Sequence, residues 1–168
     1  MKNTRLFLLC GCPGSGKSTW AHNRIVKYDG NIISRDTIRF GLLDQRGGNY
    51  FDYEDEVMDL FIRSIKASLK IPYPHDVYVD ATHLTKRSRD QVMRKLNLEE
   101  IYTIAVWFDV PVEICKYRNS LREGRAVVPN KTIEDMYNRA RKPSIYEFDE
   151  VWTINAEGDT ILEEGPLV

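Results

Sequence analysis

Short apolar runs along the chain alternate with longer segments in which apolar residues recur every three or four positions. The runs have the length of β-strands, and the longer segments have the period of helices. Five strands are predicted, at residues 5–10, 31–34, 77–80, 102–109 and 151–154. Six helices are predicted, at residues 17–27, 36–43, 52–70, 85–97, 111–122 and 131–140. The third of these helices has the most regular apolar face, formed by Val57, Leu60, Phe61, Ile65 and Leu69.

This alternation predicts an α/β fold, in which a mostly parallel sheet is covered by helices on both faces. The length of 168 residues suffices for one domain with a real core, and no repeat, low-complexity tract or linker divides the chain. We therefore expect a single domain over residues 1–168. Parallel sheets bind ligands beyond the carboxyl ends of their strands, so functional side chains should directly follow the predicted strands.

The sequence GCPGSGKST at residues 11–19 follows the first predicted strand and has the spacing of a Walker A motif. Its glycines permit left-handed backbone dihedrals, which let several N–H groups converge on one anion. The residues expected to bind the phosphates of a nucleoside triphosphate are Gly11, Pro13, Gly14, Ser15, Gly16, Lys17, Ser18 and Thr19. Lys17 would reach the β- and γ-phosphates, and Ser18 would hold Mg²⁺. The alternative, a glycine-rich turn before an ordinary helix, does not explain why Lys17 and Ser18 follow the last glycine.

Two aspartates stand where a parallel sheet would place functional groups. Asp36 follows the second predicted strand, and Asp80 closes the third. An aspartate in such a position could hold Mg²⁺, directly or through water, or orient a catalytic group. The alternative is that each caps a helix or a turn, and this applies above all to Asp36, because a helix could begin at Thr37. Asp36 is the better candidate for a carboxylate that takes the proton of an attacking hydroxyl, because its strand should neighbour the loop end of the sheet.

Phosphoryl transfer also needs cations for the charge on the transferred group, and arginine suits this role because it is planar and always charged. Arg118 and Arg122 are four residues apart and share one face of a predicted helix. Gly124 is suited to end that helix and to place Arg125 in a loop. This arrangement predicts a lid over residues 116–130 that folds over ATP. The alternative is a solvated basic helix face.

Four motifs occur in one order along residues 11–129. They are the loop GCPGSGKSTWA, Arg35-Asp36-x-x-Arg39, Asp80-Ala81-Thr82, and Arg118-Asn119-x-x-Arg122 followed by Ala126-Val127-Val128-Pro129. The ordered set resembles the kinase module of bacteriophage-type polynucleotide 5′-kinases. His83 stands where that family usually has asparagine. The family blends into a broader group of small P-loop kinases, which includes zeta-toxin-like enzymes and kinases of small metabolites.

The resemblance implies a three-layer P-loop NTPase fold with a five-stranded parallel sheet in the order 2-3-1-4-5 and an arginine-bearing lid. It implies ATP as the phosphate donor and Mg²⁺ as the cofactor, with Lys17 and Ser18 at the donor phosphates and the metal; the position of Asp80 at a strand end makes it the second candidate metal ligand. Asp36 would be the general base that activates a 5′-hydroxyl. Arg39 would contact the acceptor's phosphate on the 3′ side of the terminal nucleoside.

The same resemblance separates the roles of the lid arginines. Arg122 would stabilise the transferring phosphoryl group, together with Lys17. Arg118 and Arg125 would help on the ATP side. Asp80 would belong to the essential active-site set, with its role left open.

A basic segment offers a place for a polynucleotide. Residues 85–95 hold five basic residues and one acid, and three of the basic residues fall near the start of a predicted helix. Cations at that end oppose the helix dipole, so a phosphate-binding rim is one explanation for their presence. Arg87 would belong to this rim, and Arg35 and Arg46 could extend it. The alternative is a solvated helix face.

Aromatic residues are the other candidates for contact with an acceptor. Tyr50, Phe51 and Tyr53 could stack on a base, or they could pack their own loop onto the domain. The acidic stretch over residues 52–59 argues against a broad polyanion groove at this place.

Composition limits the remaining options. The net charge is −1, so contact with nucleic acid must come from a local patch rather than from the whole surface. Three cysteines cannot all pair and lack zinc-ligand spacing, which suggests a reducing compartment. No apolar stretch approaches the length of a membrane span, and no signal peptide is recognisable at the N-terminus. We expect a cytoplasmic protein without membrane contact.

The sequence thus favours an ATP- and Mg²⁺-dependent kinase that phosphorylates the 5′-hydroxyl of a nucleic-acid end, DNA or RNA. One alternative keeps the kinase chemistry and changes the acceptor to a nucleoside, a sugar or another small metabolite. A second is an ATP-hydrolysing switch. A third, a nucleotide-binding module without chemistry, is disfavoured because Lys17, Asp36 and Arg122 occur together.

Overall fold

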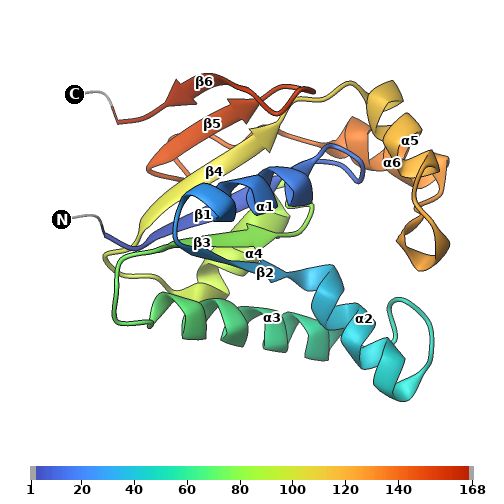
Figure 1. Ribbon diagram of the computed structural model, residues 1–168, viewed down its shortest axis with the longest axis horizontal. Helices are drawn as coiled ribbons and strands as arrows, with labels where there is room; N and C mark the ends of the chain where they lie inside the picture. The colour runs from blue at the N-terminus through green and yellow to red at the C-terminus, as the bar shows by residue number, and fades with distance from the viewer. Residues whose placement is uncertain (1–2, 167–168) are drawn as a thin grey trace.

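The computed structural model describes residues 3–166, which form one sheet flanked by helices (Figure 1). The strands are β1 (Arg5–Cys10), β2 (Gly30–Ser34), β3 (Asp76–Asp80), β4 (Tyr102–Phe108), β5 (Glu150–Ile154) and β6 (Thr160–Glu164). The helices are α1 (Lys17–Lys27), α2 (Arg35–Arg46), α3 (Glu54–Leu69), α4 (Lys86–Leu96), α5 (Val112–Ser120), the 3₁₀ helix η1 (Gly124–Ala126) and α6 (Asn130–Arg139). Within residues 3–166, every helix is too short or too polar to span a lipid bilayer.

The strands lie in the order β2-β3-β1-β4-β5-β6, and the first five are parallel. The α/β fold and the order 2-3-1-4-5 of these five strands are therefore confirmed. The predicted total of five strands is wrong, because β6 adds an antiparallel edge strand beside β5. Most side chains of β6 are exposed, including those of Ile161 and Leu162, so this strand lacks the alternation of buried and polar positions that marks a strand in sequence.

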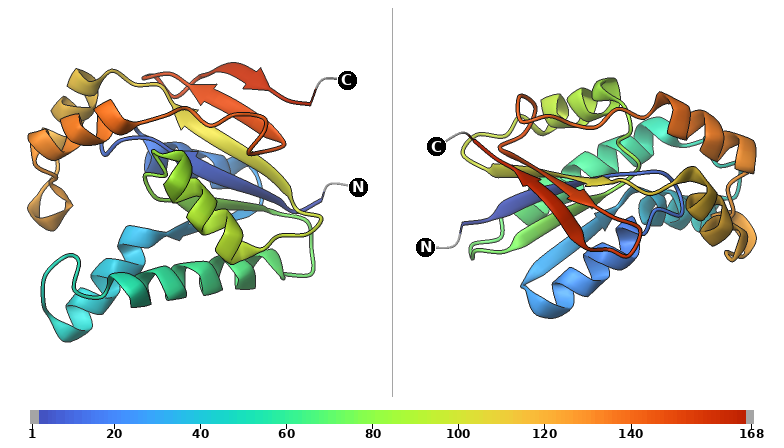
Figure 2. Two further views of the ribbon diagram at one scale, coloured as in Figure 1. Left: turned by 180° about the vertical axis from the view of Figure 1, so that it is seen from behind. Right: turned by 90° about the horizontal axis from the view of Figure 1, so that it is seen from above.

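Both faces of the sheet are buried, as the apolar runs predict. Successive residues of β1 point to opposite faces. On the α1 face, the ring centre of Phe7 lies 4.9 Å from that of Tyr78 and 5.4 Å from that of Trp152. On the other face, Leu8 packs with Phe61 of α3. Figures 1 and 2 show α1 on one side of the sheet and α3 and α4 on the other.

Helix α2 begins immediately after β2 and is longer than predicted. Ser34 is its N-cap, because the Ser34 side chain accepts a hydrogen bond from the backbone N–H of Thr37 at 3.3 Å. The helix ends at Gly47, which has a φ of 71°. Asp36 therefore lies within the first turn and is not the N-cap, so the capping alternative is wrong for this residue.

The carboxyl ends of the parallel strands meet at one edge of the sheet, and α5, η1 and α6 gather beyond that edge (Figure 1). The loop after β1, the start of α2 after β2 and the last residue of β3 all lie there. This is the edge at which a parallel sheet binds ligands. The fold thus brings the predicted phosphate loop, Asp36 and Asp80 to the same place.

Candidate active site

The loop between β1 and α1 has the backbone of a phosphate cradle. Gly14 and Gly16 adopt φ values of 81° and 95°, which favour glycine. A Cβ atom at Gly14 would lie only 2.3 Å from the carbonyl oxygen of Cys115 on α5, so a side chain at this position would push the loop away from the lid. Helix α1 starts at Lys17 without a side-chain cap, which leaves its first N–H groups available to an anion.

Lys17 is buried at the centre of this loop. Its Nζ donates hydrogen bonds to the carbonyl oxygens of Gly11, at 2.9 Å, and of Cys12, at 3.0 Å. Burial is the main cause that lowers the pKa of Lys17, and the positive charge of Arg122 adds a smaller effect in the same direction. Among the described residues, the buried hydroxyl of Ser15 has no hydrogen-bond partner. The oxygens of a triphosphate would accept hydrogen bonds from the Ser15 hydroxyl and the Lys17 ammonium group. Their negative charge would also balance the positive charge of Lys17.

A hydroxyl and a carboxylate meet at the start of α1. The Oγ of Ser18 donates a hydrogen bond of 2.6 Å to Oδ2 of Asp80. Two oxygen ligands at this position suit Mg²⁺, which usually completes its shell with waters and substrate phosphates. Within residues 3–166, no group of three or more His, Cys, Asp or Glu side chains is arranged to hold a metal. A Mg²⁺ ion bound by Ser18 and Asp80 would therefore depend on the nucleotide for further ligands.

The carboxylate of Asp36 is exposed and oriented by two donors. Its side chain is 57% exposed, and Oδ1 accepts hydrogen bonds from the Tyr50 hydroxyl at 2.7 Å and from Nη1 of Arg39 at 2.5 Å. Burial, together with the hydrogen bond to Asp36, raises the pKa of Tyr50, so the phenol remains a donor. Both bonds use Oδ1. An exposed carboxylate held in this way is accessible to a hydroxyl, as a general base would have to be.

Arg39 is engaged by the protein itself. It is 4% exposed, and its Nη2 donates to both carboxylate oxygens of Glu54 on α3, at 3.1 and 2.8 Å. Arg35 pairs with the same carboxylate. The guanidinium of Arg39 also lies 4.2 Å from the ring centre of Tyr50. An acceptor phosphate would reach Arg39 only by replacing Glu54, a partner that the sequence motif does not reveal.

The lid arginines occupy two different places. Arg118 donates from Nη2 to the carbonyl of Ala156 at 2.5 Å and from Nη1 to that of Ser15 at 3.5 Å, so it lies against the phosphate loop as predicted for the ATP side. Arg122 follows α5, is exposed, and donates a hydrogen bond of 3.4 Å to the carbonyl of Ala126. Its charge is close enough to Lys17 to affect the pKa of that residue.

Arg125 lies away from the phosphate loop, in contrast to its predicted place on the ATP side. It forms a two-point ion pair with Asp44 of α2, at 2.5 and 3.0 Å. Its guanidinium also lies 4.3 Å from the ring centre of Phe40. In this structure Arg125 therefore joins the lid to the helix that carries Asp36.

The chain matches a known family over most of its length. Residues 6–143 fit the family model described as "AAA domain". The chain belongs to the AAA domain family. Since the match runs from β1 to beyond α6, it includes the phosphate loop, Asp36, Asp80 and the lid of this AAA domain.

Solved structures with the same fold include kinases and a repair complex. A chain of the Pnkp1/Rnl/Hen1 RNA repair complex is 29% identical, with a TM-score of 0.66 over 83% of this chain and 44% of that one. A sugar kinase from Janibacter sp. HTCC2649 is 21% identical, with a TM-score of 0.60 over 93% and 87%. Kti12 from Chaetomium thermophilum, solved with ADP-AlF3, is 18% identical, with a TM-score of 0.65 over 92% and 90%.

These similarities identify the AAA domain as a P-loop kinase fold. Such a fold implies binding of ATP, typically with Mg²⁺. The similar chain of the repair complex is more than twice as long as the part that this chain covers. Because the named structures differ in their substrates, the acceptor has to be argued from the side chains of the site.

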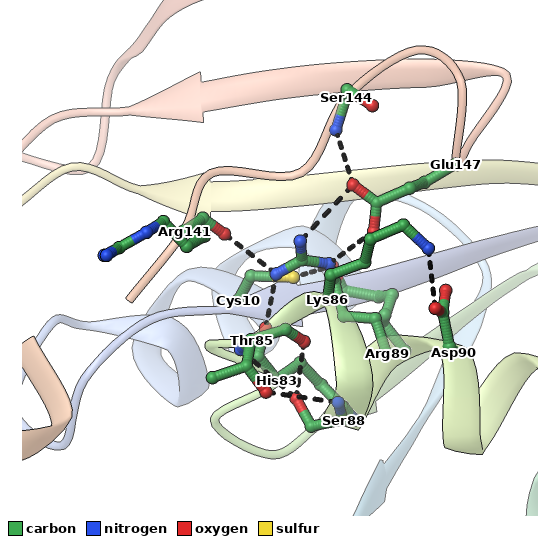
Figure 3. A network of polar contacts seen from close by, with 11 residues as sticks. Cys10, His83, Thr85, Lys86, Ser88, Arg89, Asp90, Arg141, Ser144 and Glu147 are labelled. Carbon is green, nitrogen blue, oxygen red and sulfur yellow. Dashed lines mark hydrogen bonds and ion pairs between the residues drawn. The ribbon is translucent and has the colours of Figure 1, made fainter. Parts of the chain in front are cut away.

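The basic segment at α4 is not a continuous phosphate rim. Arg87 is exposed, as the rim requires. Lys86 pairs with Asp90 at 2.6 Å. Arg89 is 1% exposed and donates to Glu147, to the carbonyl of His83 and to the carbonyl of Arg141 (Figure 3). Arg89 is thus a buried structural residue, which corrects its assignment to the rim.

This network fixes the loop that follows Asp80. Nδ1 of His83 lies 2.8 Å from the carbonyl oxygen of Leu9 and must donate to it, which leaves Nε2 without a proton. Burial lowers the pKa of His83 to about 4, so the imidazole is neutral near pH 7. His83 holds the loop to β1, and Arg89 holds it to the segment after α6 (Figure 3). The sequence motif, in which His83 replaces asparagine, predicts neither the bond of His83 to β1 nor the bonds of Arg89 to the segment after α6.

Replacement of Glu147 by alanine tests the buried pair. We expect Glu147→Ala to lower the free energy of unfolding by about 3–5 kcal/mol, because the charge of Arg89 stays buried without a carboxylate. Asp90→Ala, which removes the more exposed pair with Lys86 from the same helix, should cost less than about 1 kcal/mol. Urea unfolding measures both variants, and equal losses would contradict the assignment of Arg89 as a buried structural cation.

The neutral state of His83 predicts a pH dependence. Between about pH 6.5 and pH 4, an unfolded histidine takes up a proton that the folded His83 does not, so the free energy of unfolding should decrease as the pH falls through this range. His83→Asn should remove a slope of up to about 1.4 kcal/mol per pH unit. Urea titrations from pH 7 to pH 4 measure it, with His22→Asn as the exposed control. An unchanged slope in His83→Asn would exclude a neutral buried imidazole.

Proposed function

We propose that the AAA domain is an ATP-dependent kinase that transfers the γ-phosphate to the 5′-hydroxyl of a polynucleotide end, with Asp36 as the general base. The observation that carries this proposal is the position of Asp36. Its exposed carboxylate lies at the same sheet edge as the phosphate loop and the Ser18–Asp80 pair, and two donors on Oδ1 orient it. A group that only stabilised the helix would have no need of this orientation.

The proposed reaction is an in-line transfer. Asp36 accepts the proton of the acceptor hydroxyl while the hydroxyl oxygen attacks the γ-phosphorus, and the bond from that phosphorus to the oxygen of ADP breaks. Lys17 and Arg122 hold the charge that spreads over the equatorial oxygens, and Arg118 binds the ATP side of the loop. Mg²⁺, held by Ser18 and Asp80, would neutralise charge on the β- and γ-phosphates.

The acceptor assignment rests on the cations around Asp36. Arg39 and Arg35 share Glu54, so an acceptor phosphate could displace this carboxylate from Arg39 while Glu54 keeps its pair with Arg35. Arg87, exposed at the start of α4, is available for a second phosphate. The 29% identity to a chain of an RNA repair complex supports the same acceptor class.

A small-molecule hydroxyl is the second candidate acceptor. Arg39 is already paired with Glu54 and Asp36. Because these carboxylates balance its charge, the site does not require a phosphate on the acceptor. The similarity to a sugar kinase shows that the same fold occurs in a protein described as a kinase of a small molecule.

Asp36→Asn tests the general base. The substitution should lower kcat by about 10²–10⁴-fold, because asparagine keeps the shape but cannot take the proton. ATP affinity and melting temperature should stay close to wild type, since the side chain is exposed and Ser34 supplies the cap. Asp59→Asn on α3, at a side chain that is 59% exposed and pairs with Arg63, is the control for a lost charge. A large fall in melting temperature with normal turnover per folded molecule would show that Asp36 is a structural residue.

An acceptor screen separates the candidate functions. Labelled ATP is incubated with RNA and DNA oligonucleotides carrying 5′-hydroxyl ends, with free nucleosides and with sugars. We expect the label on the oligonucleotides, with a KM that rises steeply with salt because phosphate contacts release counterions. Label on a sugar alone would identify a small-molecule kinase. Phosphate released to water at full rate without an acceptor would identify an ATP-hydrolysing switch.

A further inference from the structure

A cluster of three aromatic side chains lies beside the catalytic carboxylate. Tyr50, whose hydroxyl bonds to Asp36 at 2.7 Å, has its ring centre 6.1 Å from that of Phe40 and 4.7 Å from that of Phe51. Both contacts are close to perpendicular, at 67° and 83°. The cluster therefore begins at the general base and extends outward to Phe51.

Phe51 is the exposed end of this cluster. It is 72% exposed, compared with 40% for Tyr50. Arginines already stack on the other two rings, since Arg39 lies over Tyr50 and Arg125 over Phe40. The tyrosine ring is thus committed to positioning Asp36, while Phe51 presents a large apolar ring to solvent. Packing of the loop onto the domain, the simpler explanation for an aromatic residue here, does not account for this exposure.

The loop that presents Phe51 is held by its own hydrogen bonds. The backbone N–H of Asn49 donates to Oδ2 of Asp52 at 2.7 Å, and the N–H of Asp52 donates to the carbonyl of Asn49 at 3.0 Å. The Tyr53 hydroxyl donates to the carbonyl of Gly47 at 3.0 Å. The loop lies at the same end of the molecule as α5 and η1 (Figure 1). An exposed ring on a structured loop loses little conformational freedom when a ligand stacks on it.

From this arrangement we infer that Phe51 is the stacking surface for the base of the acceptor's 5′-terminal nucleotide. The inference rests on the proposed function and deepens it. One tyrosine side chain separates the Asp36 carboxylate from Phe51, and in a nucleoside one sugar separates the 5′-hydroxyl from the base. A base offers a flat π-face to an aromatic ring, whereas a sugar acceptor offers none. The site therefore selects an acceptor by its terminal base as well as by its hydroxyl.

Two matched acceptors test the role of the base. They are 5′-hydroxyl oligoribonucleotides of one sequence, of which one has an intact 5′-terminal nucleotide and the other has an abasic sugar at that position. We expect wild-type kcat/KM for the intact acceptor to be at least about tenfold higher, which is within the range that stacking one base on an aromatic side chain contributes. The hydroxyl and the phosphates are the same in both, so the ratio reports the base alone.

Variants of Phe51 assign the preference to this ring. Phe51→Ala should bring the ratio of the two kcat/KM values close to one, and Phe51→Trp should restore it. Because the side chain is exposed, both variants should melt near the wild-type temperature. Tyr146→Ala is the control, because Tyr146 is 96% exposed and precedes the N-terminal end of β5, at the opposite edge of the sheet.

Each other outcome overturns the inference in a recognisable way. If wild-type protein phosphorylates both acceptors equally well, the polynucleotide kinase stands and the stacking surface fails. A preference that survives in Phe51→Ala places the base elsewhere in the site. A change of oligomeric state in Phe51→Ala, with the preference intact, assigns the ring to a contact between protein chains. If neither oligonucleotide is phosphorylated, the proposed function itself fails.

Discussion

The buried ammonium group of Lys17 is the constraint on which the functional edge of the sheet depends. A charge in the protein interior is costly unless it is paired, and the carbonyl oxygens of Gly11 and Cys12 compensate Lys17 only as dipoles. Asp80 supplies the nearest carboxylate charge, but its Oδ2 already accepts from Ser18, and the N–H groups of the loop and of the start of α1 are further donors that a phosphate would satisfy. The loop must hold this arrangement before the anion arrives. The absence of a side chain at Gly14 allows the loop to lie against the Cys115 carbonyl of α5, where a Cβ atom would clash.

The parallel sheet brings the rest of the chemistry to this anion. The strand order places Asp80, at the end of β3, between the phosphate loop that follows β1 and Asp36 after β2. The lid then contacts both sides of the site. Arg118 lies against the phosphate loop, while Arg125 reaches α2 through Asp44. Because the pair between Arg125 and Asp44 is exposed, its contribution to the free energy of unfolding is small.

Electrostatic balance around Asp36 distinguishes the two proposed acceptor classes. Glu54 pairs with both Arg35 and Arg39, and Asp36 also pairs with Arg39, so two carboxylates balance the two guanidinium groups beside the proposed general base. Tyr50 orients Asp36 without adding charge. An acceptor phosphate would take the place of Glu54, whereas a neutral acceptor would leave it where it is. The same carboxylate thus connects catalysis with the choice of substrate.

Sequence reasoning succeeded where function requires a fixed order of residues along one stretch of chain. The phosphate loop and the five parallel strands are examples, since both depend on local pattern. It failed where a side chain finds its partner through tertiary packing. Arg89 reads as a surface cation within a basic helix, but its carboxylate lies 58 residues away. The partner of Arg39 is set by the angle between α2 and α3, and β6 has no buried face to leave a pattern.

The distance between the Asp36 carboxylate and the acceptor hydroxyl tests the central claim most directly. It can be measured in a crystal structure of the protein with Mg²⁺, a non-hydrolysable ATP analogue and a dinucleotide that has a 5′-hydroxyl. If Asp36 is the general base, the 5′-oxygen lies about 2.6–3.2 Å from Oδ2 of Asp36 and faces the γ-phosphorus. A bound dinucleotide whose hydroxyl lies out of reach of Asp36, with another side chain beside it, would contradict the account.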